Sequence, residues 1–176
     1  MPIKADQSLL LLIDLQERLA PAIDNFAEVQ RHNHWLLNIA QRLDIPIAAT
    51  VQYPRGLGNM IPELAAAIPP EHIVEKIHFS AAADGCLDGL VAMSRPQVIL
   101  TGTETHVCVL QTALDLLAAG KAVYVVAEAV GSRRREDKEL ALARMRQEDL
   151  HHKVCEGLVR DAADMVQEIF ASTPGA

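Results

Sequence analysis

Residues 96–130, PQVILTGTETHVCVLQTALDLLAAGKAVYVVAEAV, contain the pattern that decides the fold. Both ends of this stretch are short runs rich in β-branched residues and bounded by polar or turn residues, as buried strands are. The residues between them, 105–119, have a helical pattern that Gly120 closes. A strand, a helix and a second strand in this order predict two parallel strands joined by a right-handed crossover.

The same alternation of strand and helix runs through most of the chain. The segment SLLLLIDLQ at 8–16 is a continuous apolar run ended by polar residues, the pattern of a strand buried on both faces of a parallel sheet. The other predicted elements are strands at 45–53, 72–76 and 149–157 and helices at 26–43 and 162–170. We therefore predict a single α/β domain over residues 1–176, with three layers (α/β/α) and a mainly parallel six-stranded sheet.

Composition limits the possible functions. The 176 residues suit one domain, and because half of them are hydrophobic and only 3% are aromatic, we expect an aliphatic core. The net charge of −7 opposes a large nucleic-acid or anionic-membrane surface, since phosphate binding depends on clustered Lys and Arg. The one basic run, 133–135, is followed by Glu136 and Asp137 and is interpreted as a solvated loop and helix start. No apolar run is long enough to cross a bilayer.

Three cysteines, Cys86, Cys108 and Cys155, have no CxxC spacing. Their odd number, in a chain without a recognisable signal peptide, predicts reduced thiols and a cytoplasmic location. Cys108 has three possible roles at this point: a nucleophile, a metal ligand, or a small buried residue, which is the usual fate of a free cysteine. Its position in the predicted first turn of a helix favours a reactive thiol, because unpaired N–H groups and the helix dipole stabilise a thiolate there.

Polar residues follow the predicted strands at the edge where α/β sheets bind ligands. Asp14, Gln52, Lys76 and the segment 103–108 each come at the carboxyl end of a strand, so together they could line one crevice. A helix N-cap or a structural ion pair would explain Asp14 as well as a catalytic role does. The buried strand before it favours a desolvated carboxylate with a raised pKa, which suits a general base. Lys76 by itself is weaker evidence, because most lysines are solvated.

Four motifs carry a family resemblance: LLLIDLQ at 10–16, TVQYPRGLG at 50–58, VEKIHFSA at 74–81, and VILTGTETHVCVLQTALDLLAAGKAVYVVAEAVGSR at 98–133. With this combination the chain resembles the isochorismatase-like cysteine hydrolase superfamily, which includes nicotinamidases and N-carbamoylsarcosine amidases. The resemblance implies the strand order 3-2-1-4-5-6. It also implies a homo-oligomer, at least a dimer, with contacts through the helices after strands three and four.

The resemblance implies a catalytic triad of Asp14, Lys76 and Cys108. Asp14 would take the thiol proton, Lys76 would hold Asp14, and Cys108 would attack an amide-like carbonyl to form a thioester. In the family an uncommon cis peptide bond lies four residues before the nucleophile, which corresponds here to Thr103–Glu104. The oxyanion hole would then consist of the backbone N–H groups of Glu104 and Cys108.

The substrate is expected to be a small molecule, bound by residues in the loops around the triad. The residues expected to contact it are Gln52, Tyr53, Phe79, Ser80 and Thr103.

No metal or other cofactor is expected. Nicotinamidases of the superfamily have a DxHxH-type metal motif after strand two, where this chain reads QYPRGLG, a form that resembles a metal-free subgroup. His32 and His34 are two residues apart and therefore do not share one helical face. His151 and His152 lie in a C-terminal stretch that we do not align with the family, and each histidine is more easily explained as a surface residue than as a ligand.

Three other functions stay open. The chain could be a catalytically silent oligomeric binding module of the same fold, which the intact triad disfavours. It could also catalyse isochorismate-type vinyl ether hydrolysis, but enzymes of the superfamily that do so can lack the cysteine. A redox-sensor thiol is the third alternative, although no resolving cysteine lies near Cys108 in the sequence.

Overall fold

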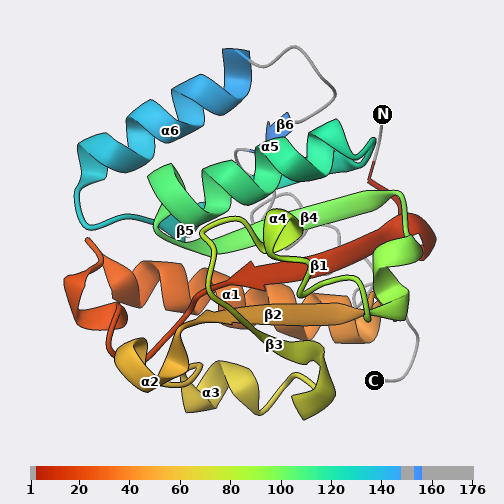
Figure 1. Ribbon diagram of the computed structural model, residues 1–176, viewed down its shortest axis with the longest axis horizontal. Coiled ribbons are helices and arrows are strands. Elements are labelled where there is room, and N and C mark those ends of the chain that lie inside the picture. Colours follow the sequence, from red (N-terminus) through yellow and green to blue (C-terminus); the bar gives the residue numbers. More distant parts are fainter. Residues whose placement is uncertain (1–2, 148–152, 156–176) are drawn as a thin grey trace, which may run out of the picture.

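The computed structural model describes residues 3–147 and 153–155, which form a parallel β-sheet between two layers of helices (Figure 1). In the order in which they lie side by side, the strands are β3 (Ile73–Lys76), β2 (Ile47–Gln52), β1 (Ser8–Ile13), β4 (Gln97–Thr103), β5 (Ala122–Gly131) and β6 (Lys153–Cys155). The predicted fold class and the order of the first five strands are confirmed. The three-residue β6 pairs in parallel with β5, and the rest of the predicted strand 149–157 lies outside the described residues.

The helices connect these strands as the alternation predicts. They are α1 (Phe26–Arg42), α2 (Pro54–Leu57), α3 (Pro62–Ala65), α4 (Ala81–Asp84), α5 (Leu110–Ala118) and α6 (Arg135–Gln147), with short 3₁₀ turns at Ala5–Gln7, Ala20–Ala22, Pro70–His72 and Val91–Ser94. The predicted helix at 162–170 lies outside the described part of the chain. None of the described helices is both long and apolar enough to span a bilayer.

The predicted helix at 105–119 is two elements rather than one. A single π-helical turn, η5 (Thr105–Val109), precedes α5. The carbonyl oxygen of Glu104 accepts hydrogen bonds from the N–H groups of both Val107, at 2.9 Å, and Val109, at 3.4 Å. The wider turn carries Cys108, in keeping with the tendency of π-turns to occur at functional sites.

Two hydrophobic cores hold the sheet between the helices. Leu9 and Leu11 of β1 face the core shared with α5 and α6, whereas Leu10 and Leu12 face the core shared with α1. All six residues of β1 are therefore buried, as the continuous apolar run predicts.

Gly102 lets β1 and β4 come unusually close at the end that carries the polar residues. A Cβ atom at this position would lie 2.1 Å from the carbonyl oxygen of Ile13, and the φ angle of Gly102 is 130°. Only glycine adopts this backbone geometry without strain. The close approach brings Asp14, which follows β1, next to Thr103 and the turn that follows β4.

Candidate active site

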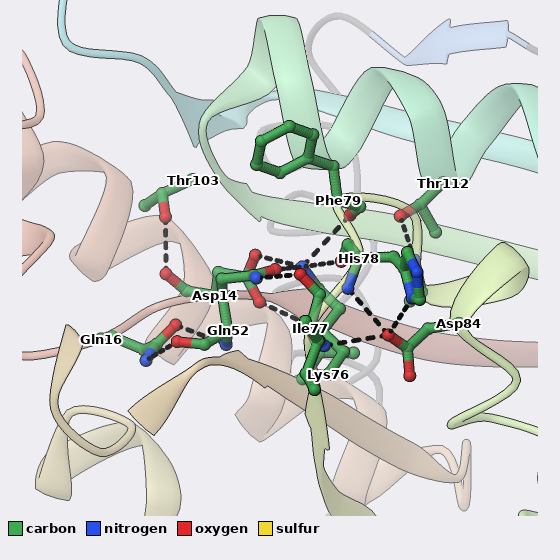
Figure 2. A network of polar contacts seen from close by, with 12 residues as sticks. Asp14, Gln16, Gln52, Lys76, Ile77, His78, Phe79, Asp84, Thr103 and Thr112 are labelled. Atoms are coloured by element: carbon green, nitrogen blue, oxygen red, sulfur yellow. Dashed lines mark hydrogen bonds and ion pairs between the residues drawn. The ribbon is translucent and has the colours of Figure 1, made fainter. Parts of the chain in front are cut away.

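The carboxyl ends of four neighbouring strands bring the predicted triad together. Asp14 follows β1, Lys76 ends β3, and Cys108 lies in η5 after β4. Gln52 ends β2, between the strands that carry the aspartate and the lysine. Figure 2 shows the network of polar contacts around Asp14, Gln52 and Lys76.

Asp14 is completely buried and held on several sides. Its backbone has a left-handed conformation, with φ at 52°, and its carbonyl oxygen accepts a hydrogen bond of 2.6 Å from the Thr103 hydroxyl. The Thr50 hydroxyl donates to Oδ1 at 2.7 Å, and the Lys76 ammonium lies 2.8 Å from Oδ2. Burial raises the pKa of the Asp14 carboxyl above its ordinary 3.8, although the positive charge of Lys76 acts in the opposite direction. Asp14 is therefore not a helix cap, whereas the alternative of an ion pair is present, with Lys76 as the partner.

Lys76 is a buried cation with no exposed side-chain surface. Besides Asp14, its ammonium group contacts three neutral oxygens: Gln52 Oε1 at 2.6 Å, the His78 carbonyl at 3.3 Å and the Phe79 carbonyl at 3.1 Å. A buried charge is stable only with such a set of partners. The common solvated role of lysine does not apply here.

Cys108 is buried, with 5% of its surface exposed, and it lines the same cavity as Asp14, whose carboxylate acts on the thiol. Burial, followed by the negative charge of Asp14, raises the pKa of the Cys108 thiol to about 12, and Lys76 opposes this rise. The expectation of a thiolate was wrong for this state of the protein, because burial and the facing carboxylate outweigh the helix terminus. At neutral pH the group is a thiol with a proton acceptor beside it.

The predicted cis bond at Thr103–Glu104 is also wrong, because the described residues contain only trans peptide bonds. The chain instead turns from β4 into η5 through Glu104, which has a left-handed backbone with φ at 54°. The Glu104 carboxylate is largely buried and pairs with Nε of Arg133 at 2.6 Å. His106 Nδ1 lies 3.7 Å from the same carboxylate and 3.1 Å from the Ser132 hydroxyl.

A cavity of about 450 Å³ opens over Asp14 and Cys108. Its other lining residues are Leu19, Gln52, Leu57, Phe79, Glu104, His106, Val107, Arg133, Arg134 and Asp137. The cavity therefore has apolar walls from four separate segments and a polar wall from the turns after β4 and β5. Its size and its mixed walls are typical of a small-molecule site.

The predicted substrate-binding residues divide into two groups. Gln52 and Phe79 line this cavity. Tyr53, which is 57% exposed, lines a separate hollow beside Lys76, and Ser80 caps α4 by accepting a hydrogen bond from the Ala83 N–H at 3.2 Å. Thr103 is buried and holds the backbone of Asp14, as described above. The structure does not bring these last three side chains to the cavity wall.

Sequence reasoning missed the wall after β5. Arg133 and Arg134 line the cavity while their side chains remain exposed, so the interpretation of the basic run as a solvated loop and helix start is confirmed and only their place at the cavity was missed. The same rule that selected the other strand ends would have found them, because they follow the carboxyl end of β5. Gln16 was also missed: its side-chain amide bonds both the N–H and the carbonyl of Gln52 and so joins the loops after β1 and β2.

Within residues 3–147 and 153–155, no group of three or more acidic, histidine or cysteine side chains could hold a metal ion. His32 lies 2.9 Å from the Glu128 carbonyl, and His34 lies on an exposed part of α1, 3.3 Å from Asn38. The predictions for His151 and His152 concern residues outside the described part of the chain.

Comparisons with known proteins show the family of the chain and agree with its fold. The family model described as the Isochorismatase domain matches residues 8–154. Isochorismatase domain-containing protein 2A of Mus musculus is 43% identical over 165 residues, which cover 90% of this chain and 78% of the mouse protein. A solved structure of MAR1 ribonuclease from Caenorhabditis elegans has a TM-score of 0.82 and 32% identity, covering 99% of this chain and 95% of its own. YcaC from Pseudomonas aeruginosa, solved with hexane-2,5-diol and covalent acrylamide, has a TM-score of 0.78 and 25% identity, covering 86% of this chain and 77% of its own.

Proposed function

Because the chain belongs to the isochorismatase family of hydrolase folds, we propose that it is a cysteine-dependent hydrolase of a small amide or a related carbonyl compound. Asp14, Lys76 and Cys108 are its catalytic residues. One observation carries the proposal: a buried thiol shares a cavity lining with a buried carboxylate that pairs with a buried ammonium. A nucleophile, a base and a group that holds the base are the parts of an activated-nucleophile site.

In the first step the Cys108 sulfur attacks the substrate carbonyl carbon as its proton passes to Asp14. The carbonyl π electrons move to the oxygen, which becomes an oxyanion. Since the pKa of the thiol is about 12, the thiolate is not formed in advance, and proton transfer accompanies attack. The N–H groups of Glu104, which precedes η5, and of Cys108, which lies within η5, are the proposed donors to the oxyanion, even though the bond before Glu104 is trans.

In the second step the oxyanion collapses and the carbon–nitrogen bond breaks. The leaving amine takes the proton from Asp14, so a thioester and a carboxylate remain. Water then attacks the thioester, gives one proton to Asp14 and releases the acid as the carbon–sulfur bond breaks. That proton returns to the Cys108 sulfur, and the resting state is restored. Throughout this cycle Lys76 favours the charged form of Asp14.

Two further observations support a small carbonyl substrate. The cavity volume of about 450 Å³ suits a small molecule, and Leu57, Phe79 and Val107 give it an apolar side. The solved YcaC carries covalent acrylamide, a small amide with a thiol-reactive double bond.

The name of the MAR1 ribonuclease relative supplies a second candidate, a nuclease. The net charge of −7 disfavours this function, because binding a phosphate backbone requires clustered positive charge. At the cavity, Arg133 is paired with Glu104, and Asp137 lines the same wall as Arg134. We therefore rank amide hydrolysis first.

A panel of small amides, screened for ammonia release with Cys108→Ala as the control, tests the proposal. Isochorismate and a single-stranded RNA are included in the same screen. Release of ammonia by the wild type and not by Cys108→Ala is the expected result. Cleavage of RNA or isochorismate that survives Cys108→Ala, with no amide turned over, would assign the cavity to another reaction. A wild type that turns over none of these compounds would favour the silent binding module.

The proposed enzyme is a homo-oligomer, a cytoplasmic protein and independent of cofactors. Ile77 and Val91 are 77% and 89% exposed in the single chain, and such apolar surface is suited to contact with another copy. Cys86 and Cys108 are unpaired thiols, which fits a reducing compartment. Light scattering at micromolar concentration is expected to give at least a dimer, and a monomer would contradict that part of the proposal.

A further inference from the structure

The loop between β3 and α4, residues 77–80, folds back over the ammonium group of Lys76 (Figure 2). The carbonyl groups of His78 and Phe79 both accept hydrogen bonds from Lys76 Nζ. Gln52 supplies the third neutral oxygen, through Oε1. The three oxygens thus come from only two places, the Gln52 side chain and this loop.

One carboxylate oxygen fixes the loop in this shape. Asp84 Oδ2, at the end of α4, accepts hydrogen bonds from the backbone N–H groups of Ile77, at 2.9 Å, and His78, at 2.8 Å. His78 Nδ1 lies 2.9 Å from the same oxygen. These hydrogen bonds lower the pKa of Asp84, and the bonds from the His78 and Ile77 N–H groups have the largest effect. The carboxylate is therefore charged at neutral pH.

The same carboxylate also determines how the Gln52 amide is oriented. The peptide unit between Ile77 and His78 gives its N–H to Asp84, so its carbonyl points the opposite way and accepts from Gln52 Nε2 at 2.5 Å. Because the Gln52 amide nitrogen donates to the Ile77 carbonyl, the amide oxygen Oε1 is the atom that faces Lys76. A chain of hydrogen bonds therefore runs from Asp84 through one peptide unit and one amide to the ammonium group.

These neutral oxygens matter most during the reaction. While Asp14 holds the thiol proton it is a neutral acid, and Lys76 then has no carboxylate partner. A buried ammonium without a countercharge is stable in its position only if other oxygens hold it. Gln52 Oε1 and the two loop carbonyls are those oxygens.

We propose that Asp84 is a positioning residue of the active site, which fixes loop 77–80 and the Gln52 amide so that Lys76 stays paired with Asp14. Asp84 lies outside the cavity lining and acts through Lys76. The inference rests on the proposed function for its role in catalysis, but the pairing that it describes can be measured without a substrate.

The test is a titration of the Asp14 side-chain carboxyl by ¹³C NMR, with the signal assigned by its loss in Asp14→Asn. The titratable groups that face Asp14 are Lys76 from β3 and Cys108 from η5. In Asp84→Ala, a looser Lys76 should raise the midpoint of Asp14 by about one pH unit, part of the 1–3 units that a neighbouring cation supplies. Asp84→Asn keeps an acceptor for the two N–H groups, so its midpoint should lie between those of the wild type and Asp84→Ala.

The sign of the shift separates positioning from a simple field effect. Removal of a negative charge at Asp84 by itself lowers the pKa of any nearby carboxyl, so a rise at Asp14 must come through Lys76. Asp88→Ala is the matched control. Asp88 is an exposed aspartate that follows α4, and its side chain forms no hydrogen bond or ion pair with the described residues. Its Asp14 midpoint should equal that of the wild type.

A midpoint in Asp84→Ala that is unchanged or lower would overturn the inference. If Asp84→Ala does not fold, Asp84→Asn decides by the same criterion. Failure of the proposed function is a different result. In that case the wild type turns over no amide, and this outcome does not depend on the midpoint of Asp14. If turnover is found, the low-pH limb of the kcat/KM profile should move upward in Asp84→Ala by the same amount as the NMR midpoint.

Discussion

Replacement of Asp14 by Asn separates the thiolate population of Cys108 from its reactivity toward a substrate. After burial, the negative charge of Asp14 is the next largest cause of the raised pKa of the Cys108 thiol. Asp14→Asn therefore lowers that pKa from about 12, although burial, the largest cause, still holds it above the ordinary 9.0. The variant has more thiolate at any given pH and lacks the base.

The two effects have opposite signs and different sizes. Each unit by which the thiol pKa falls raises the thiolate fraction at pH 8 by about tenfold. Loss of a general base costs about 10²- to 10⁴-fold in rate, or about 3–5 kcal/mol of barrier. Because attack is limited by proton transfer in the proposed mechanism, we expect turnover of the amide to fall by at least about 100-fold although the thiolate fraction rises.

Two measurements on the same protein check this prediction. The pH dependence of thiolate absorbance near 240 nm, compared with Cys108→Ala, gives the pKa of the thiol, and ammonia release gives turnover.

Asp14→Asn also leaves the buried Lys76 without a countercharge, which costs about 3–5 kcal/mol of stability. Lys76→Met combined with Asp14→Asn removes both charges and is expected to recover much of this stability without recovering turnover. Turnover in Asp14→Asn within tenfold of the wild type would refute Asp14 as the base, and a higher thiol pKa would refute its electrostatic effect on Cys108.

Four other outcomes are expected. Cys108→Ala should abolish amide turnover and leave the melting temperature within a few degrees of the wild type, because it removes a single sulfur atom beside an open cavity; normal turnover by this variant would end the mechanism. Thr50→Val removes the hydroxyl that donates to Asp14, so the low-pH limb of the kcat/KM profile should move to higher pH; an unmoved limb would show that this bond does not tune the base. Gly102→Ala should lower the free energy of unfolding by more than about 2 kcal/mol in denaturant titrations, since its methyl group would meet the Ile13 carbonyl; a smaller loss would mean that β1 and β4 can separate at little cost. Activity should be the same before and after dialysis against EDTA, and a loss that zinc or manganese restores would contradict a metal-free site.

The sheet was predictable because its pattern is local and repeated. The continuous apolar run of β1 has one physical explanation, burial on both faces, and the two cores confirm it. The alternation of strands with helices then fixes the parallel direction. The end at which Asp14, Lys76 and Cys108 meet follows from that direction alone, since parallel strands all have their carboxyl ends at one edge.

The finer features of the site depend on contacts that a sequence pattern does not encode. Glu104 has a left-handed backbone where a cis bond was predicted, and it leads from β4 into η5. Ser80 and Thr103 lie close to the triad along the chain, but their hydroxyl groups bond to the backbone of Ala83 and Asp14. Arg133 is exposed, as interpreted, but its ion pair with Glu104 joins the turns after two different strands, and charges that are neighbours along the chain do not reveal such a pair.

Burial acts on both members of the proton-transfer pair, and this explains why Lys76 is needed. Ordinary pKa values of 3.8 for a carboxyl and 9.0 for a thiol leave a gap of about 5 units against transfer from Cys108 to Asp14. Burial raises the pKa of each group, since each carries a negative charge when ionised. Without a cation, Asp14 would become a neutral acid and could no longer accept a proton. Burial makes Asp14 a stronger base than it is in water, and Lys76, 2.8 Å away, opposes this rise in pKa and favours the anion that accepts the proton. The gap that remains must be closed by formation of the carbon–sulfur bond, so the site is reactive only when a carbonyl group lies against the sulfur.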